Sequence, residues 1–157
     1  MSRVLADVFG EKPQKLAPDR SIYRLSGRVS VNGTPATLKT RIGPNDTIET
    51  GKSSEVVFVN GVSAFVLRES SRMSLEQQRA TNVLTNALRL ATGKLLAVFG
   101  PNNPQRIDTA TATIGIRGTG IYAETDPEQT YFCTCYGVTD INANSDPNSR
   151  KTVTSTH

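Results

Sequence analysis

Two Asn-Gly dipeptides constrain this chain most, because each one stands beside segments rich in strand-forming residues. Asn32-Gly33 follows the alternating run Arg28–Val31. Asn60-Gly61 separates Glu55–Val59 from Val62–Leu67. Both central residues of a type I′ turn need a positive φ, which asparagine and glycine tolerate, so this dipeptide predicts a tight β-hairpin. The chain is therefore expected to contain several antiparallel hairpins.

The rest of the sequence continues this pattern of short strands separated by turns. The 19 threonines favour strands over helices, and no region alternates a strand with a long helix. We expect an all-β fold, with many short antiparallel strands in a two-layer sandwich or β-roll and little helix. Gln77–Asn86 is polar and lacks alternation, so it is expected to be a loop or a short helix. Further strands are expected at Thr47–Thr50, Met73–Leu75, Lys94–Phe99, Ile107–Thr113, Ile121–Ala123, Tyr131–Tyr136 and Thr152–Thr156.

The length of 157 residues fits one domain with one core. Residues 1–21 carry two prolines and no clear period, which indicates a loose lead-in with one short helix at Val4–Phe9. Residues 22–157 are expected to form a single β domain. No stretch reaches the length of about 18 apolar residues that a membrane-spanning helix needs, so no membrane span is expected.

The charge distribution argues against a nucleic-acid partner. The formal net charge is +4, but lysine and arginine are scattered through the first 117 residues and absent from 118 to 149. Proteins that follow a phosphate backbone concentrate positive charge on one face. The pattern is typical of a mildly basic body with an acidic segment near its end.

The sequence offers little material for catalysis. The single histidine is the last residue, His157, and so a Ser–His–Asp arrangement would depend on a chain end. The acids expected on strands, Glu49, Glu55 and Asp108, show no spacing that would pair two carboxylates. We therefore predict that the protein is not an enzyme.

Cys133 and Cys135 stand two residues apart in an expected strand, so their side chains share one face. Two thiolates on one face suit a soft transition metal such as zinc, and His157 is the candidate third ligand. The alternative is that both cysteines are small packing residues with no chemistry. A weaker hypothesis gives Tyr122, Tyr131 and Tyr136 a role in sugar binding, and its alternative is that they pack the core.

The run Gly115–Gly120, with the sequence GIRGTG, does not match a phosphate loop. It lacks the G-x-G-x-x-G spacing and the Gly-Lys-Ser/Thr ending, and no helix is expected after it. Its three glycines favour a sharp bend or a close approach of the backbone to another strand.

Six segments of the chain stand in an order and spacing that can be compared with known families: Gly27–Gly33, Ile42–Gly51, Ser54–Val59, Ser71–Leu75, Gly93–Val98 and Thr109–Thr119. This order and spacing resemble the FecR domain, the extracytoplasmic module of bacterial iron-dicitrate-type transmembrane regulators. The resemblance covers about Ser26 to Ala123, with 124–157 as an extension that carries the Cys-x-Cys pair. It marks Asp46, Thr50, Gly51, Arg117, Gly118 and Thr119 as family motif positions, which we expect to stabilise the fold.

The resemblance implies a periplasmic or otherwise extracytoplasmic β module, with the leader absent from the given sequence. In the regulators, this module relays a signal from an outer-membrane receptor across the inner membrane to a sigma factor. This sequence is more similar to the stand-alone relatives, because it has neither the membrane helix nor the sigma-binding region. We predict a non-enzymatic module without a cofactor that binds a partner protein or cell-envelope ligand, for example by strand addition at a sheet edge. The alternative is a metal-binding or redox-sensing domain built on Cys133, Cys135 and His157.

Overall fold

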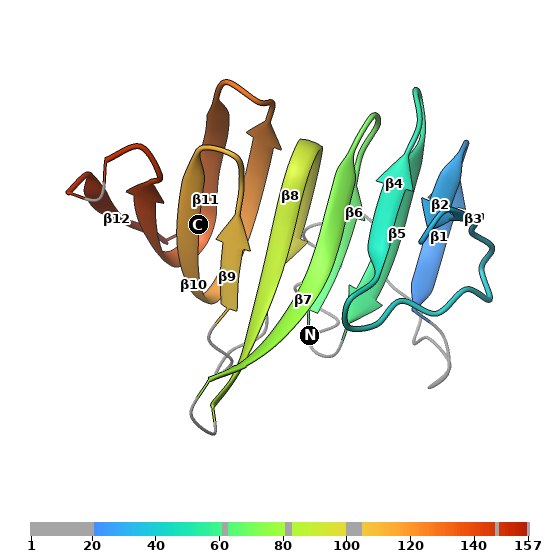
Figure 1. The fold of residues 1–157 in the computed structure, drawn as a ribbon, viewed down its shortest axis with the longest axis horizontal. Helices are drawn as coiled ribbons and strands as arrows, with labels where there is room; N and C mark the ends of the chain where they lie inside the picture. Colours follow the sequence, from blue (N-terminus) through green and yellow to red (C-terminus); the bar gives the residue numbers. More distant parts are fainter. Residues whose placement is uncertain (1–20, 61–62, 81–82, 100–104, 147, 157) are drawn as a thin grey trace.

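The computed structural model describes residues 21–60, 63–80, 83–99, 105–146 and 148–156. Within these ranges the backbone forms twelve strands and no helix, so nothing described is a helix that could cross a membrane. All twelve strands belong to one sheet, which confirms the all-β prediction (Figure 1). The strands are β1 (Ile22–Ser26), β2 (Val29–Val31), β3 (Thr34–Pro35), β4 (Thr47–Thr50), β5 (Glu55–Asn60), β6 (Ser63–Leu67), β7 (Arg72–Ala80), β8 (Val83–Val98), β9 (Gln105–Asp108), β10 (Ala112–Thr125), β11 (Thr130–Ala143) and β12 (Arg150–Thr156).

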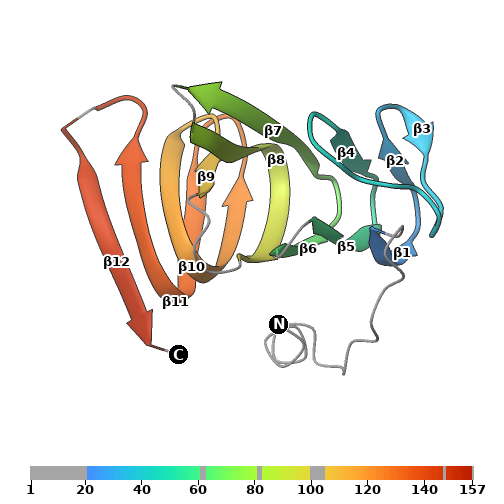
Figure 2. The same cartoon turned by 90° about the horizontal axis from the view of Figure 1, so that it is seen from below.

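The sheet folds over on itself because its long strands change neighbours along their length. In β8, residues 83–92 pair with β7, whereas residues 95–98 pair with β6. β10 makes the same change, since residues 113–116 pair with β9 and residues 120–125 pair with the end of β8. Figure 2 shows the resulting roll, with β2, β3, β4 and β7 in one layer and β1, β5 and β6 in the other.

A change in side-chain alternation accompanies each bend. The β8 residues that belong to the main hydrophobic cluster are Leu88 and Leu90 before the bend and Leu95 and Ala97 after it. The switch from even to odd positions lies between Leu90 and Leu95, where β8 has a register shift against β7 and Gly93 has a φ of +107°. β10 has a register shift between Arg117 and Gly120, and its buried positions likewise change from even to odd. One extra residue at each bend therefore keeps apolar side chains pointing into the roll.

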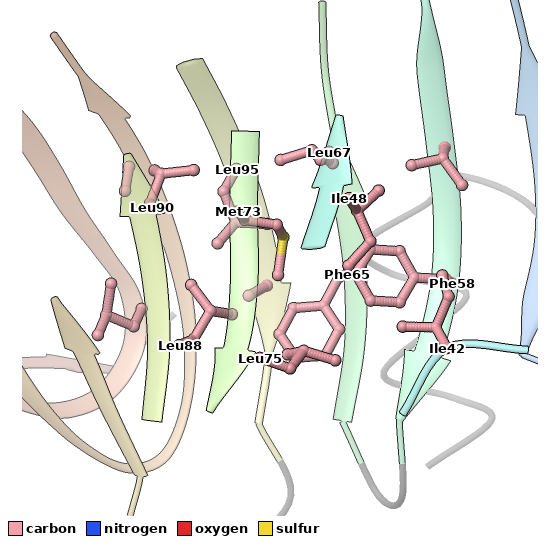
Figure 3. Close-up of a cluster of buried hydrophobic side chains, with 14 of the residues drawn as sticks. Ile42, Ile48, Phe58, Phe65, Leu67, Met73, Leu75, Leu88, Leu90 and Leu95 are labelled. Atoms are coloured by element: carbon pink, nitrogen blue, oxygen red, sulfur yellow. The ribbon is translucent and has the colours of Figure 1, made fainter. Parts of the chain in front are cut away.

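The core lies between the two layers. Phe58 and Phe65 stack with ring centroids 5.0 Å apart, and Phe65 meets Phe99 edge-on at 5.6 Å. Ile48 and Met73 come from the opposite layer and are fully buried. Figure 3 shows these side chains meeting across the roll. Every residue of β6 is buried, as expected for a strand covered on both faces.

Two tight turns, called glycine corners here, have the same hydrogen-bond arrangement and hold the ends of the layers. One contains Gly27 and the other contains Gly93. In the first, the Arg28 N–H donates to Ser54 Oγ (2.8 Å), beside Gly27 with φ +75°. In the second, the Lys94 N–H donates to Ser71 Oγ (2.9 Å), beside Gly93. The serine hydroxyls donate in turn to the carbonyl oxygens of Lys52 (2.9 Å) and Glu69 (3.0 Å).

The two corners share a further feature in the residue before each serine. Ser53 has φ 52° and Ser70 has φ 53°, so both occupy the left-handed region that non-glycine residues seldom adopt. Each corner combines a glycine, a basic residue and a Ser-Ser pair, so the same turn with the same hydrogen bonds occurs twice in this fold.

The hairpin predictions agree with the structure wherever it describes them. Asn32 (φ 52°) and Gly33 (φ 82°) form the turn between β2 and β3. The arms on either side of Asn60-Gly61 are β5 and β6, and residues 61–62 lie outside the described ranges. The last predicted strand is β12. The helix predicted at Val4–Phe9 also lies outside the described ranges.

Two elements were predicted wrongly. Ile107–Thr113 was expected to be one strand, but β9 ends at Asp108 and β10 begins at Ala112. Thr109 Oγ1 accepts the N–H groups of Thr111 and Ala112, which turns the chain between the two strands.

Gln77–Asn86 was expected to be a loop or short helix, but residues 77–80 end β7 and residues 83–86 begin β8, with Arg79 opposite Leu84 and Ala80 opposite Val83. Residues 81–82 lie outside the described ranges. Seven of the ten residues are polar and the three apolar ones do not alternate, so the stretch carries no period-two signal. Pairing with a neighbouring strand, which no local pattern reveals, determines its conformation.

Candidate functional site

The family motif positions near β4 take part in hydrogen bonds that hold turns together. Asp46 accepts hydrogen bonds through Oδ2 from the Gly43 N–H (2.9 Å) and through Oδ1 from Asn32 Nδ2 (2.8 Å). Its carbonyl oxygen also accepts from the Leu75 N–H (3.0 Å). Asp46 thus joins the β2–β3 turn, the turn before β4 and strand β7.

Thr50 and Gly51 connect the two glycine corners. Thr50 Oγ1 accepts from the Ser71 N–H (3.0 Å) and donates to the carbonyl oxygen of Arg68. The Gly51 N–H donates to the Arg28 carbonyl, and the Gly51 carbonyl accepts from the Ser70 N–H, both at 2.9 Å. These two residues therefore contact both corners, Thr50 through its hydroxyl and Gly51 through its backbone.

Arg117, Gly118 and Thr119 lie in β10 at its register shift. Before the shift Arg117 pairs with Val138, and after it Gly120 pairs with Tyr136. The side chains of residues 117–119 are outside the described part of the structure, so their stabilising role stays a prediction.

The two cysteines lie in the first half of β11, as predicted. Cys133 is exposed and Cys135 is half-buried, and neither forms a disulfide. Burial raises the pKa of the Cys135 thiol, and the charge and hydrogen bond of the neighbouring Cys133 add to this shift. Among the described residues, no three His, Cys, Asp or Glu side chains gather as metal ligands would. His157 lies outside the described residues.

Two of the three tyrosines singled out in the sequence lie together on the outer face of the sheet. Tyr122 in β10 and Tyr131 in β11 meet edge-on, with ring centroids 6.5 Å apart. Burial, together with the hydrogen bond that Tyr122 donates to the Glu124 carboxylate, raises the pKa of Tyr122 from 10.0 to about 12. Tyr131 is 61% exposed and therefore does not pack the core. The side chain of Tyr136 lies outside the description.

The three strand acids are separated from one another and each faces an arginine. Glu55 pairs with Arg24 (3.4 Å), Glu49 with Arg72 (3.7 Å) and Asp108 with Arg106 (3.1 Å). These are ion pairs of a solvated surface, which contribute little to stability. The described residues thus bring no two of these carboxylates together as a catalytic pair.

Sequence reasoning missed a cleft of about 380 Å³ near the turn between β10 and β11. Glu69, Lys94, Glu124, Asp126 and Tyr131 are among its lining residues. Strand alternation alone places Glu124 on the same face as Tyr122. However, Glu69 and Lys94 come from distant parts of the chain. The pairing of β8 with β10 places Lys94 opposite Glu124, and Glu69 forms an ion pair with Lys94.

The rolled sheet, which is antiparallel except for the pairing of β8 with β9, and its ion-paired surface acids define a small all-β module. The profile of the family described as FecR protein matches residues 46–137, which is more than half of the chain. The chain therefore belongs to the FecR family. The match spans β4 to the middle of β11 and includes both Thr50-Gly51 and the Arg-Gly-Thr segment.

Solved structures with this fold include two crystal structures of a putative anti-sigma factor from Parabacteroides distasonis. Their TM-scores are 0.58 and 0.56, each at 11% sequence identity. Each alignment covers 69% of this chain and 50% of the other, so the chain spans about half the length of that protein. At this identity the likeness shows the fold alone. No curated protein matches the sequence.

Proposed function

We propose that this chain is a non-enzymatic, extracytoplasmic interaction module that recognises a partner protein by accepting one of the partner's strands. The observation that carries the proposal is the edge strand β12, which pairs with β11 and with no other described strand. Membership of the FecR family supports a role in a signalling regulator, and the anti-sigma factor that shares the fold is consistent with it.

The register defines which backbone groups β12 offers. The Ala143 N–H donates to the Ser149 carbonyl oxygen, and the pairing of β11 with β12 continues in the same register without a shift. Hydrogen-bonded pairs alternate in an antiparallel ladder, so Lys151 and Val153 point their N–H and C=O groups toward β11. Thr152 and Thr154 consequently direct theirs outward, toward an added strand.

The side chains of β12 suit this use. The strand has seven residues without proline, glycine or acid, and Arg150, Lys151, Thr152 and Thr154 are exposed. An added strand would meet threonines over most of its length and two cations at one end. We therefore expect the partner strand to carry acidic residues opposite Arg150 and Lys151.

Thr154→Pro tests the edge directly, because it removes the outward N–H while the bonds of Val153 to β11 remain. We expect it to weaken partner capture about tenfold or more, since it removes one ladder hydrogen bond and obstructs an incoming strand. The measurement uses a photo-crosslinking residue at position 152 in living cells, followed by mass spectrometry of the crosslinked protein.

Thr154→Ala is the matched control, because it changes the side chain and retains the N–H. It should capture the partner as the parent protein does, and both variants should show the same thermal unfolding midpoint within a few degrees. A Thr154→Pro variant that crosslinks the same protein to the same extent would refute strand addition at β12.

A second candidate function is the binding of a soft transition-metal ion by Cys133 and Cys135. The contact between the two thiols on one strand face favours it, since thiolates are preferred ligands of Cu⁺ and Zn²⁺. Native mass spectrometry with one equivalent of Zn²⁺ or Cu⁺ should then show one bound ion. Cys133→Ser and Cys135→Ser should each abolish this adduct. Uptake that is unchanged in the double variant would exclude the pair as the ligands.

A further inference from the structure

The cleft near the β10–β11 turn combines an exposed aromatic ring with several carboxylates. It lies beside the Gly93 corner and has a volume of about 380 Å³. Tyr131 is one of two large hydrophobic side chains that are exposed among the described residues; the other is Leu38, outside this cleft. An exposed aromatic ring at the rim of a polar cleft is typical of a binding surface rather than of a solvated sheet face.

The Tyr131 ring is held in place by its neighbours. Tyr131 lies opposite Glu124 in the β10–β11 register, and Tyr122 lies opposite Cys133. The edge-on contact with Tyr122 supports one side of the Tyr131 ring. Tyr122 is itself fixed, because its hydroxyl donates to the Glu124 carboxylate. A ring oriented in this way loses little conformational entropy when a ligand stacks on its free face.

The polar groups of the cleft are oriented in advance as well. Asp126 Oδ1 accepts the N–H groups of Glu128 (2.8 Å) and Gln129 (2.9 Å), which directs the carboxylate from a tight turn. Glu69 pairs with Lys94 at 3.4 Å. When one oxygen of a carboxylate accepts hydrogen bonds from the protein, the other oxygen is left to accept hydrogen bonds from a ligand. The hydroxyls of a sugar are such donors.

We propose that this cleft binds a neutral sugar unit of an envelope glycan. The apolar face of a pyranose ring stacks on Tyr131, and its hydroxyl groups donate to the carboxylates of Glu124 and Asp126. Three carboxylates and one ammonium group line the cleft, for a net charge of −2, so uronic acids and phosphorylated sugars are repelled. Lys94 lies among the acids and disfavours a cationic side chain in the same place.

The glycan site is separate from the strand edge proposed above. β12 pairs with residues 136–142 of β11, whereas Tyr131 lies nearer the β10–β11 turn. The two sites can therefore fail independently. A Thr154→Pro protein should retain sugar binding, and a Tyr131→Ala protein should retain partner capture at β12.

Titration of the ¹⁵N-labelled protein with tri-N-acetylchitotriose and with cellotetraose tests the proposal by NMR. Binding should shift the amide signals of β10 and β11 around Glu124 and Tyr131. Tyr131→Ala should weaken affinity about tenfold, because it removes the stacking surface. Tyr131→Phe, which keeps the ring, should restore most of that loss. Leu38→Ala is the control for removing an exposed hydrophobic side chain elsewhere, and should bind as the parent protein does.

Four results would overturn the assignment. The first is the absence of signal shifts with either neutral oligosaccharide. The second is equal affinity of Tyr131→Ala and the parent protein. The third is Tyr131-dependent binding of a poly-arginine peptide without any sugar binding, which would assign the cleft to a basic protein segment. Preferential binding of oligogalacturonate would contradict the charge argument and overturn the neutral-sugar assignment.

Discussion

Replacing Gly93 by alanine is expected to lower the free energy of unfolding by about 4 kcal/mol, from backbone strain and steric overlap together. A Cβ atom at this position would lie 2.0 Å from Ser71 Oγ and 2.5 Å from Ser71 Cα. The second distance involves the backbone, so rotation of the serine side chain cannot relieve the overlap. The φ of +107° is also outside the region that alanine readily adopts.

Gly33→Ala separates these two contributions. Gly33 has φ +82°, but nothing lies within 4 Å of a Cβ built there. Its substitution should cost only about 1 kcal/mol, from the backbone conformation alone. Urea unfolding monitored by circular dichroism measures both variants. Equal losses for Gly93→Ala and Gly33→Ala would show that the packing of Gly93 on Ser71 is not what limits this corner.

The turns and strands that could be predicted from the sequence are those determined by residues close together in the chain. Asn32-Gly33 forms its turn through two positive φ angles, and the alternating segments around it became strands. The segments on either side of Asn60-Gly61 were expected to form a hairpin, and β5 and β6 pair with each other there. Each of these inferences depended on residues fewer than ten positions apart.

What the sequence did not reveal are the features that depend on strand pairing over long distances. In the sequence, the change from even to odd buried positions across Gly93 interrupts the alternation expected of one strand. In the structure, β8 continues through this point and passes from one layer into the other. The Gly27 and Gly93 corners also use serines 27 and 22 residues away, Ser54 and Ser71, which no local pattern connects.

The candidate sites show the same division. Cys133 and Cys135 share a face because strand geometry places residues i and i+2 together. Tyr122 and Tyr131 could each be identified as candidate binding residues, but their contact follows from the β10–β11 register. Lys94 enters the cleft through the pairing of β8 with β10, and Glu69 lies beside it through their ion pair. The candidate residues could therefore be identified from the sequence, but their arrangement around one cleft could not.

Phe65→Ala is expected to destabilise the protein by about 4 kcal/mol, in the range of buried phenylalanine truncations. Phe65 is 2% exposed, and its ring stacks on Phe58 and meets Phe99 edge-on. The substitution removes both aromatic contacts and leaves a cavity between the two layers. β6 is hydrogen-bonded to β5 on one side and to β8 on the other, so moving this strand alone into the cavity would disturb both pairings.

Tyr131→Ala is the natural comparison, because it truncates an aromatic residue of the same sheet on the solvent side. It should change the free energy of unfolding by no more than about 1 kcal/mol, since it removes only the edge-on contact with Tyr122. Thermal and urea unfolding of both variants measure the difference. If Phe65→Ala were no more destabilising than Tyr131→Ala, the two layers would not be held together by the aromatic cluster, because its central ring would be dispensable.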